Sequence, residues 1–293
     1  MKRIVSLVII AILPVFAFAT STRMNLSEAL RKEIVKLEAV NITGNYKGKA
    51  VKLTITNNSS SSIELKIDMG IILKPENPAF QPLVLAGEEQ LTLKAHEKGN
   101  VDVEVFADNS YKAIPIEGLR YTYLRIAGDT LIKILRFIKD HSLFDHLGQA
   151  AVWTITNYHP INNVYERSRD SLSRKLISFI VEVTKREKPT FYASYTDNEI
   201  QAQPAYLAKM DKIYIPFDVS LKAAGTLSAV LFSPKGQPVK TIYEPQSFEP
   251  GTHRIIAELD PTGFETGKYS VKLTENEKTL QDKVILVNPP AYE

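Results

Sequence analysis

The segment VKLTITNNSSSSIELKI, residues 51–67, decides the class of fold. Apolar and polar residues alternate in its first part, VKLTIT, and again in its last part, IELKI. A period of two buries one face of a strand and leaves the other in water, as in antiparallel sheets. The polar run at residues 57–62 between the two parts predicts a hairpin loop.

Further alternating segments at residues 91–93 and 101–105 extend this pattern. Repeated short strands separated by turn residues predict a β-sandwich in the N-terminal part. Residues 26–37, which precede the strands, have the spacing of a short amphipathic helix.

The period becomes helical at residues 129–157 and again at residues 168–187. Asp129 and Asp170 are expected as helix caps or first-turn acids, since negative charge is favourable at a helix N-terminus. Pro160 separates the two segments because proline cannot continue a helix. We therefore expect a helical subdomain that packs against, or is appended to, the first sandwich.

A second strand-rich unit follows residues 188–204, a polar stretch bounded by Pro189 and Pro204 that is typical of a linker. Its alternating segments and the type I turn expected at residues 233–236 predict a small immunoglobulin-like sandwich. The expected organisation is a mainly β protein with a sandwich and helical subdomain over residues 20–187 and an Ig-like sandwich over residues 205–293.

Residues 1–19 have the pattern of a secretory signal peptide: Lys2 and Arg3, an apolar run at residues 4–16, and Ala-Phe-Ala at the end. The apolar run is short for a membrane span. We expect cleavage after Ala19, a periplasmic or extracellular location and no transmembrane span after removal of the leader. An uncleaved N-terminal anchor is the alternative.

The composition, 44% hydrophobic and 24% charged over 293 residues, is that of a folded globular protein. Lys2 and Arg3 account for two of the three excess positive charges, so a chain without the leader carries a net charge of +1. Such a balance offers no basic surface for nucleic acid. The sequence contains no cysteine, which excludes disulfides, thiolate metal sites, cysteine nucleophiles and lipid-modified cysteine anchors.

Motifs for common catalytic chemistry are missing from the sequence, including the His-Glu-x-x-His helix, the Gly-x-Ser-x-Gly elbow and the phosphate-binding loop. His141 and His146 bracket Asp145, but the spacing fits no standard metal site, and capping of a helix explains Asp145. We expect no metal, no cofactor and no enzymatic activity. The alternative is a secreted hydrolase with a dispersed active site, which a cleft with several strongly shifted titratable groups would indicate.

The segment LGQAAVW, residues 147–153, together with Phe106-Ala107, resembles bacterial thioester adhesin domains. Those domains carry an aromatic-Cys pair on a strand and the motif Gln-x-x-apolar-Trp on a helix. The cysteine and the glutamine are joined in an internal thioester. Ala107 stands at the cysteine position, so the resemblance implies an adhesin-like scaffold without the reactive bond. The alternative is that Gln149 and Trp153 are a buried polar contact and a core aromatic. We expect Trp153 to be buried against the first sandwich and Gln149 to bond a strand's backbone.

The segments AVLFSPKGQPV (residues 229–239), GKYSVKL (267–273) and KVILV (283–287) resemble Ig-like modules of flagellar hook-cap repeats and of type IX secretion sorting domains. The resemblance spans residues 205–288 and implies an Ig-like accessory module. A type IX cargo with a C-terminal sorting module is an alternative, although the Tyr-Pro-Asn-Pro opening of such domains is absent.

Aromatic residues suggest a contact surface, because such rings offer a large area at low entropy cost. Tyr121 and Tyr158 flank the helical unit and, with Gln149 and Trp153, are the candidate binding residues. The alternative is that the aromatic side chains pack between the two domains and hold them together. The sequence predicts an exported, non-enzymatic binding or structural protein of the bacterial envelope or exterior, with a protein or glycan as partner.

Overall fold

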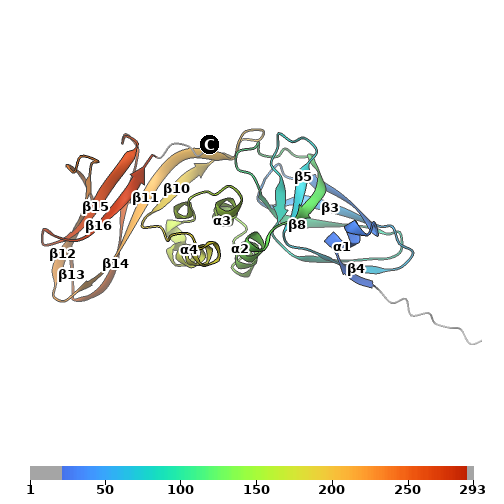
Figure 1. Ribbon diagram of the computed structural model, residues 1–293, viewed down its shortest axis with the longest axis horizontal. Coiled ribbons are helices and arrows are strands. Elements are labelled where there is room, and N and C mark those ends of the chain that lie inside the picture. Colours follow the sequence, from blue (N-terminus) through green and yellow to red (C-terminus); the bar gives the residue numbers. More distant parts are fainter. Residues whose placement is uncertain (1–21, 289–293) are drawn as a thin grey trace, which may run out of the picture.

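The computed structural model describes residues 22–288, with the side chains of Asp197 and residues 206–209 left aside. The predicted signal peptide therefore lies outside the described residues. The predicted mainly-β class is confirmed, since strands form both ends of the molecule and the helices lie in its middle, apart from one short helix in the N-terminal part (Figure 1). Within residues 22–288, every helix is too short or too polar to cross a lipid bilayer.

The N-terminal part contains nine strands and one short helix. The strands are β1 (Thr22–Asn25), β2 (Val35–Asn41), β3 (Gly48–Asn57), β4 (Ile63–Ile67), β5 (Ile71–Pro75), β6 (Leu83–Leu85), β7 (Glu89–Leu93), β8 (Lys98–Ala107) and β9 (Arg120–Ile126). Six of them close a barrel in the order β2-β3-β8-β6-β5-β9, and the others form a sheet in the order β1-β4-β7. The layered packing expected of a sandwich is present, but one layer closes on itself because β9 pairs with both β2 and β5.

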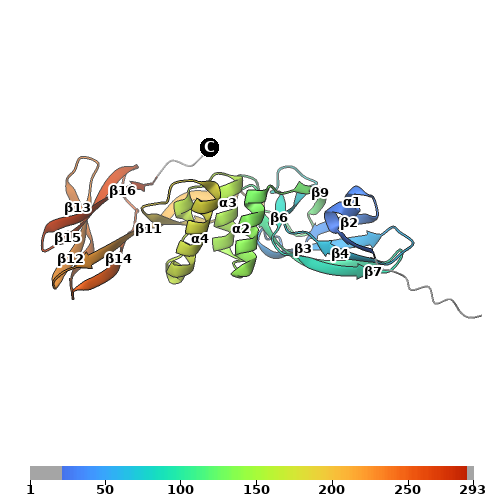
Figure 2. The same cartoon turned by 60° about the horizontal axis from the view of Figure 1, so that its bottom comes forward.

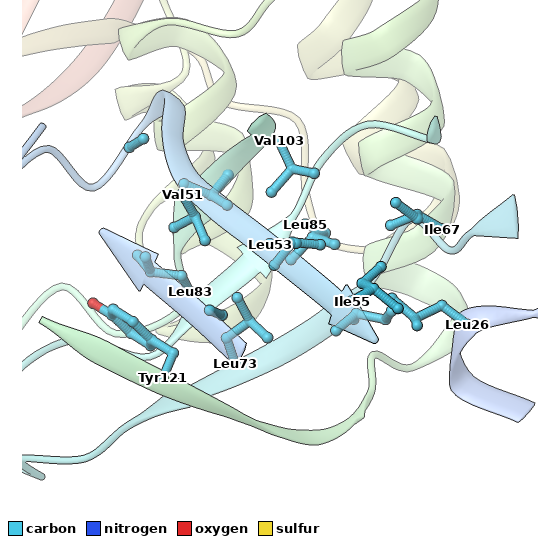
Figure 3. Close-up of a cluster of buried hydrophobic side chains, with 14 of the residues drawn as sticks. Leu26, Val51, Leu53, Ile55, Ile67, Leu73, Leu83, Leu85, Val103 and Tyr121 are labelled. Carbon is cyan, nitrogen blue, oxygen red and sulfur yellow. The ribbon is translucent and has the colours of Figure 1, made fainter. Parts of the chain in front are cut away.

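One apolar core joins the barrel and the smaller sheet. Val51, Leu53 and Ile55 of β3 point into it, as the alternating pattern predicts, while the intervening Lys52 is exposed. Figure 3 shows these side chains meeting residues from other strands of the barrel and Ile67 of the smaller sheet. Burial of apolar surface on this scale is the main source of the stability of the fold.

The hairpin expected between β3 and β4 is wrong. β3 pairs with β2 and β8, whereas β4 pairs with β1 and β7, so residues 58–62 cross from the barrel to the smaller sheet. The buried Asn57 anchors this crossing, because its Nδ2 donates to the carbonyl oxygens of Ser61 and Lys94, each at 2.8 Å. The alternation of apolar and polar residues indicates that a strand has one buried face, but it does not indicate which strand pairs with it.

The helix expected over residues 26–37 is shorter than predicted. Helix α1 (Leu26–Arg31) ends before Glu33, whose φ of 57° takes the chain out of the helix. The chain then enters β2, in which Val35 and Ala39 are buried. The second half of the apparent helical stripe is therefore the inward face of a strand.

The helical layer consists of α2 (Asp129–Asp140), α3 (His146–Thr156) and α4 (Asp170–Thr184), with the short 3-10 turns η1 (Ile161–Asn163) and η2 (Arg167–Arg169). Asp129 and Asp170 lie in first turns, as predicted, and Asp145 caps α3 by accepting from the Leu147 backbone N–H at 2.9 Å. Figure 2 shows the three helices side by side between the two β parts.

The C-terminal part is a sandwich of two sheets. Its strands are β10 (Tyr192–Asp197), β11 (Tyr206–Leu221), β12 (Gly225–Phe232), β13 (Pro238–Phe248), β14 (Gly251–Leu259), β15 (Gly267–Glu275) and β16 (Lys278–Val287). The sheets have the orders β10-β11-β14 and β13-β12-β15-β16 and enclose one core. The predicted turn between β12 and β13 is present, with the Gly236 N–H donating to the Ser233 carbonyl at 2.8 Å.

The predicted linker, residues 188–204, needs correction. Residues 192–197 form β10, which pairs antiparallel with β11. The loop that follows packs on the barrel: the Ile114 N–H donates to the Gln203 carbonyl at 2.8 Å, and Ala205 lies in the barrel core. The β10–β11 hairpin thus passes along the helical layer from one β part to the other (Figure 1). Its polar exposed residues gave it the composition of a linker.

Candidate functional site

The contact between α3 and the end of β8 lies at the centre of the molecule. Gln149 is fully buried, its Oε1 accepts from the Ala107 N–H at 2.9 Å, and its Nε2 donates to the Ala107 carbonyl at 3.0 Å. The expected bond from Gln149 to a strand's backbone is confirmed. The strand residue that it holds, Ala107, is the one that the predicted resemblance pairs with Gln149.

A close approach of α3 to the barrel makes this contact possible. A Cβ atom at Gly148 would lie 2.0 Å from the Leu143 carbonyl oxygen and 2.9 Å from a ring atom of Phe106. Such distances are far inside van der Waals contact, so only glycine fits at this position. The glycine allows the next residue, Gln149, to reach the backbone of β8.

Trp153, one turn further along α3, is buried in the core of the barrel, with 2% of its surface exposed. Its ring stacks on Tyr46 with a centroid distance of 5.9 Å and an interplanar angle of 19°. The expected burial of Trp153 against the first β unit is confirmed. The side chain has a packing role and is not accessible to a ligand.

The remaining two candidate residues lie in opposite environments. Tyr121 on β9 is buried in the barrel core, where its hydroxyl donates to the Gln81 carbonyl at 3.3 Å and burial raises its pKa. Tyr158 follows α3, is 82% exposed and has a φ of 56°, which is uncommon for an aromatic residue. The four candidates therefore do not form one binding surface, since Tyr158 alone is accessible.

A buried pair of polar residues that sequence reasoning missed lies beside Trp153. Ser110 Oγ and His159 Nε2 are 3.0 Å apart, although the residues are 49 positions apart in the sequence. Arg186 Nη2 donates to the His159 carbonyl at 3.0 Å. A serine beside a histidine can act as a nucleophile and base, but exposures of 0% and 2% close this pair to substrate. No local motif indicated the pair, because the fold alone brings it together.

A cavity of about 410 Å³ opens next to Ala107, where the barrel meets α2 and α3. Its polar wall includes Asp108, Asn109, Arg125, Asp129 and Asn157. Its apolar wall includes Ile72, Pro82, Leu131 and Ile155.

Asp108 is the most perturbed acid of this cavity. Burial raises the pKa of its carboxyl group to about 6, although the positive charge of Arg125 acts in the opposite direction. Its backbone N–H donates to the Pro82 carbonyl at 2.9 Å, whereas its side chain bonds to no residue among those described. The sequence held no signal for this acid, because its environment is assembled from distant segments.

Within residues 22–288, no group of three or more histidine, cysteine, aspartate or glutamate side chains is arranged to hold a metal ion. The expectation that the protein uses no metal or cofactor stays a prediction.

Comparison with known proteins leaves the family open. No protein-family model matches the chain, and no curated protein matches it. A solved structure described as a "putative beta-galactosidase from bacteroides fragilis" aligns with 84% of this chain at 9% identity and a TM-score of 0.20. This chain spans 34% of the length of that protein. A similarity at this level carries no argument about fold or function.

Proposed function

We propose that this chain is an exported, non-enzymatic binding or structural protein of the bacterial envelope or exterior, built on an adhesin-like scaffold without an internal thioester. The observation that carries the proposal is the contact between Gln149 and Ala107. The resemblance pairs these two positions, and they are joined by two hydrogen bonds across 42 residues of sequence. Alanine offers no thiol, so the pair holds the strand without forming a covalent bond.

The elongated arrangement supports a role in presenting a surface. The barrel, the helical layer and the C-terminal sandwich follow one another along the long axis (Figure 1). The C-terminal sandwich, proposed here as an Ig-like module, would act as a spacer or attachment unit. Export rests on the sequence of residues 1–19, and recovery of a chain that begins at Thr20 from the envelope or medium would support it.

The accessible chemistry favours binding over hydrolysis. A hydrolase cleft would combine several strongly shifted titratable groups. In the cavity beside Ala107, Asp108 is the group with a large shift, and the Ser110–His159 pair is buried away from solvent. Neither feature provides an accessible nucleophile with its base.

Ala107→Cys tests the correspondence with thioester domains. If the two positions match, the introduced sulfur attacks the side-chain carbonyl carbon of Gln149, and a thioester forms as one ammonia leaves. Intact mass would then fall by one ammonia relative to the mass calculated for the variant, and methylamine would open the bond and leave an adduct on residue 149. The double variant Ala107→Cys/Gln149→Ala is the control and should keep its full mass. A folded Ala107→Cys protein with a free thiol and full mass would contradict the proposed scaffold.

A further inference from the structure

We propose that the cavity beside Ala107 binds one unit of a glycan, a neutral and hydroxyl-rich saccharide ring. This inference rests on the proposed function as a binding protein and names the ligand class of its site. The volume of about 410 Å³ lies within the range of ligand pockets in proteins. The walls come from β5, β9, the start of α2, the end of α3 and the residues that follow β8, so several elements and connections form the cavity together.

The polar wall places hydrogen-bond donors beside acceptors. The Oδ1 of Asn109 accepts from the Tyr111 N–H at 3.0 Å, and the Oδ1 of Asn157 accepts from the Ser110 N–H at 3.1 Å. These bonds use the amide oxygens, while the NH₂ groups of both residues bond to no described residue. The Asp108 carboxylate supplies acceptors. A sugar hydroxyl both donates and accepts, so it matches such a wall.

The charges of the wall favour a neutral ligand. The wall contains two carboxylates, those of Asp108 and Asp129, and one guanidinium, that of Arg125. An anion would meet two negative groups for one positive group. A small cation would meet the guanidinium and would leave the amide donors and the apolar wall unused. The side chains of Ile72, Pro82 and Leu131 suit the C–H face of a sugar ring.

Asp108 offers a positioned acceptor that no described residue uses. The bonds from Gln149 to Ala107 fix the backbone just before it, and its own N–H is held by Pro82, so the acid is well positioned. Its carboxylate is partly buried and makes no hydrogen bond to any described residue. Partial burial weakens its hydration, so a ligand hydroxyl that donates to this carboxylate would form a charge-assisted hydrogen bond.

Tyr158 provides an exposed aromatic group next to the cavity in the sequence. It directly follows Asn157, which lines the cavity, and its side chain is 82% exposed in a left-handed backbone conformation. Strained conformations of this kind are often kept at binding sites. A neighbouring sugar of a longer glycan would find an accessible ring one residue from the cavity.

Saturation-transfer NMR on the mature chain tests the proposal with a stated panel: glucose, galactose, mannose, N-acetylglucosamine, lactose and cellobiose. We expect transfer to the ring protons of at least one of them and a fall of about tenfold or more in affinity in Asp108→Ala, the loss of one or two good hydrogen bonds. Asp108→Ala should fold, because the side chain bonds to no described residue. Asp102→Ala, an exposed position on β8, the strand that Asp108 directly follows, is the matched control and should bind like the parent chain.

The proposal fails if no sugar of the panel shows transfer, or if Asp108→Ala binds as well as the parent chain. Stronger binding of butylamine or inorganic phosphate than of every sugar would also overturn it, by assigning the cavity to charged ligands. The Ala107→Cys experiment is independent of these results, so the adhesin-like scaffold can stand without a sugar pocket. Hydrolysis of lactose or cellobiose would contradict the non-enzymatic function while leaving the saccharide site in place.

Discussion

At the residue scale, Asp108 makes the folded state sensitive to pH. Burial raises the pKa of its carboxyl group from an ordinary 3.8 to about 6. Between these two values the folded chain keeps a proton that the unfolded chain releases, so the folded state binds more protons. Through this group the free energy of unfolding therefore increases as the pH falls from 7 towards about 5.

Asp108→Asn should remove this dependence. We expect a free energy of unfolding at pH 7 that is higher by about 1 kcal/mol, because a partly buried charge that Arg125 compensates only in part disappears. We also expect a flatter profile between pH 7 and about pH 5, measured by urea unfolding at several pH values. Asp102→Asn serves as the exposed control. Parallel profiles of the parent chain and Asp108→Asn would show that Asp108 titrates at an ordinary pKa.

At the element scale, α3 connects the helical layer to the barrel through Gln149 and Trp153. Both side chains lie on one helix face, four residues apart. Gln149 bonds the end of β8, while Trp153 enters the barrel core and stacks on Tyr46. Loss of either side chain would weaken the packing of the whole helix on the barrel.

Trp153→Ala should lower the free energy of unfolding by about 3–5 kcal/mol, the range for removal of a large buried aromatic side chain. Trp153→Phe, which keeps an aromatic ring, should lower the free energy of unfolding by clearly less. Because Trp153 is the only tryptophan, the fluorescence of the parent chain reports its environment directly. We expect blue-shifted emission that acrylamide quenches only weakly. Red-shifted, freely quenched emission from the folded parent chain would contradict the burial of this residue.

At the scale of the whole molecule, the β10–β11 hairpin connects all three parts. Tyr192 of β10 stacks on Tyr165 of the helical layer at 4.3 Å, and the loop after β10 packs on the barrel. The apolar core of the helical layer also includes Phe106 from the barrel and Tyr214 from the C-terminal sandwich. We therefore expect the three parts to behave as one cooperative body.

Limited trypsin digestion tests this expectation and the predicted domain division. Lys185 is exposed between α4 and β10, so it is the expected first cleavage site, since exposed connections are nicked before packed strands. The two fragments should stay associated and elute together at the size of the intact chain. Tyr192→Ala should loosen this association. Fragments that separate after a single cut in the parent chain would instead support independent modules over residues 20–187 and 205–293.

Local patterns in the sequence determined the fold class and most of the elements. One face of each element is buried, which produces the alternation in β3, β4 and β8 and the helical stripes of α2 and α4. This periodicity can be recognised from the sequence of each element alone. For the same reason the burial of Trp153 and the bond from Gln149 to a strand could be predicted. Both lie on one face of a helix, four residues apart and among apolar or small neighbours.

Only the tertiary structure decided which elements meet. The separation of β3 and β4 into different sheets, the closure of the barrel by β9 and the role of β10 depend on contacts between distant segments. The Ser110–His159 pair and the environment of Asp108 have the same origin. The shape of a cavity and the pKa of a group inside it both depend on which residues surround them. Here those residues are far apart in the sequence, so only the folded chain brings them together.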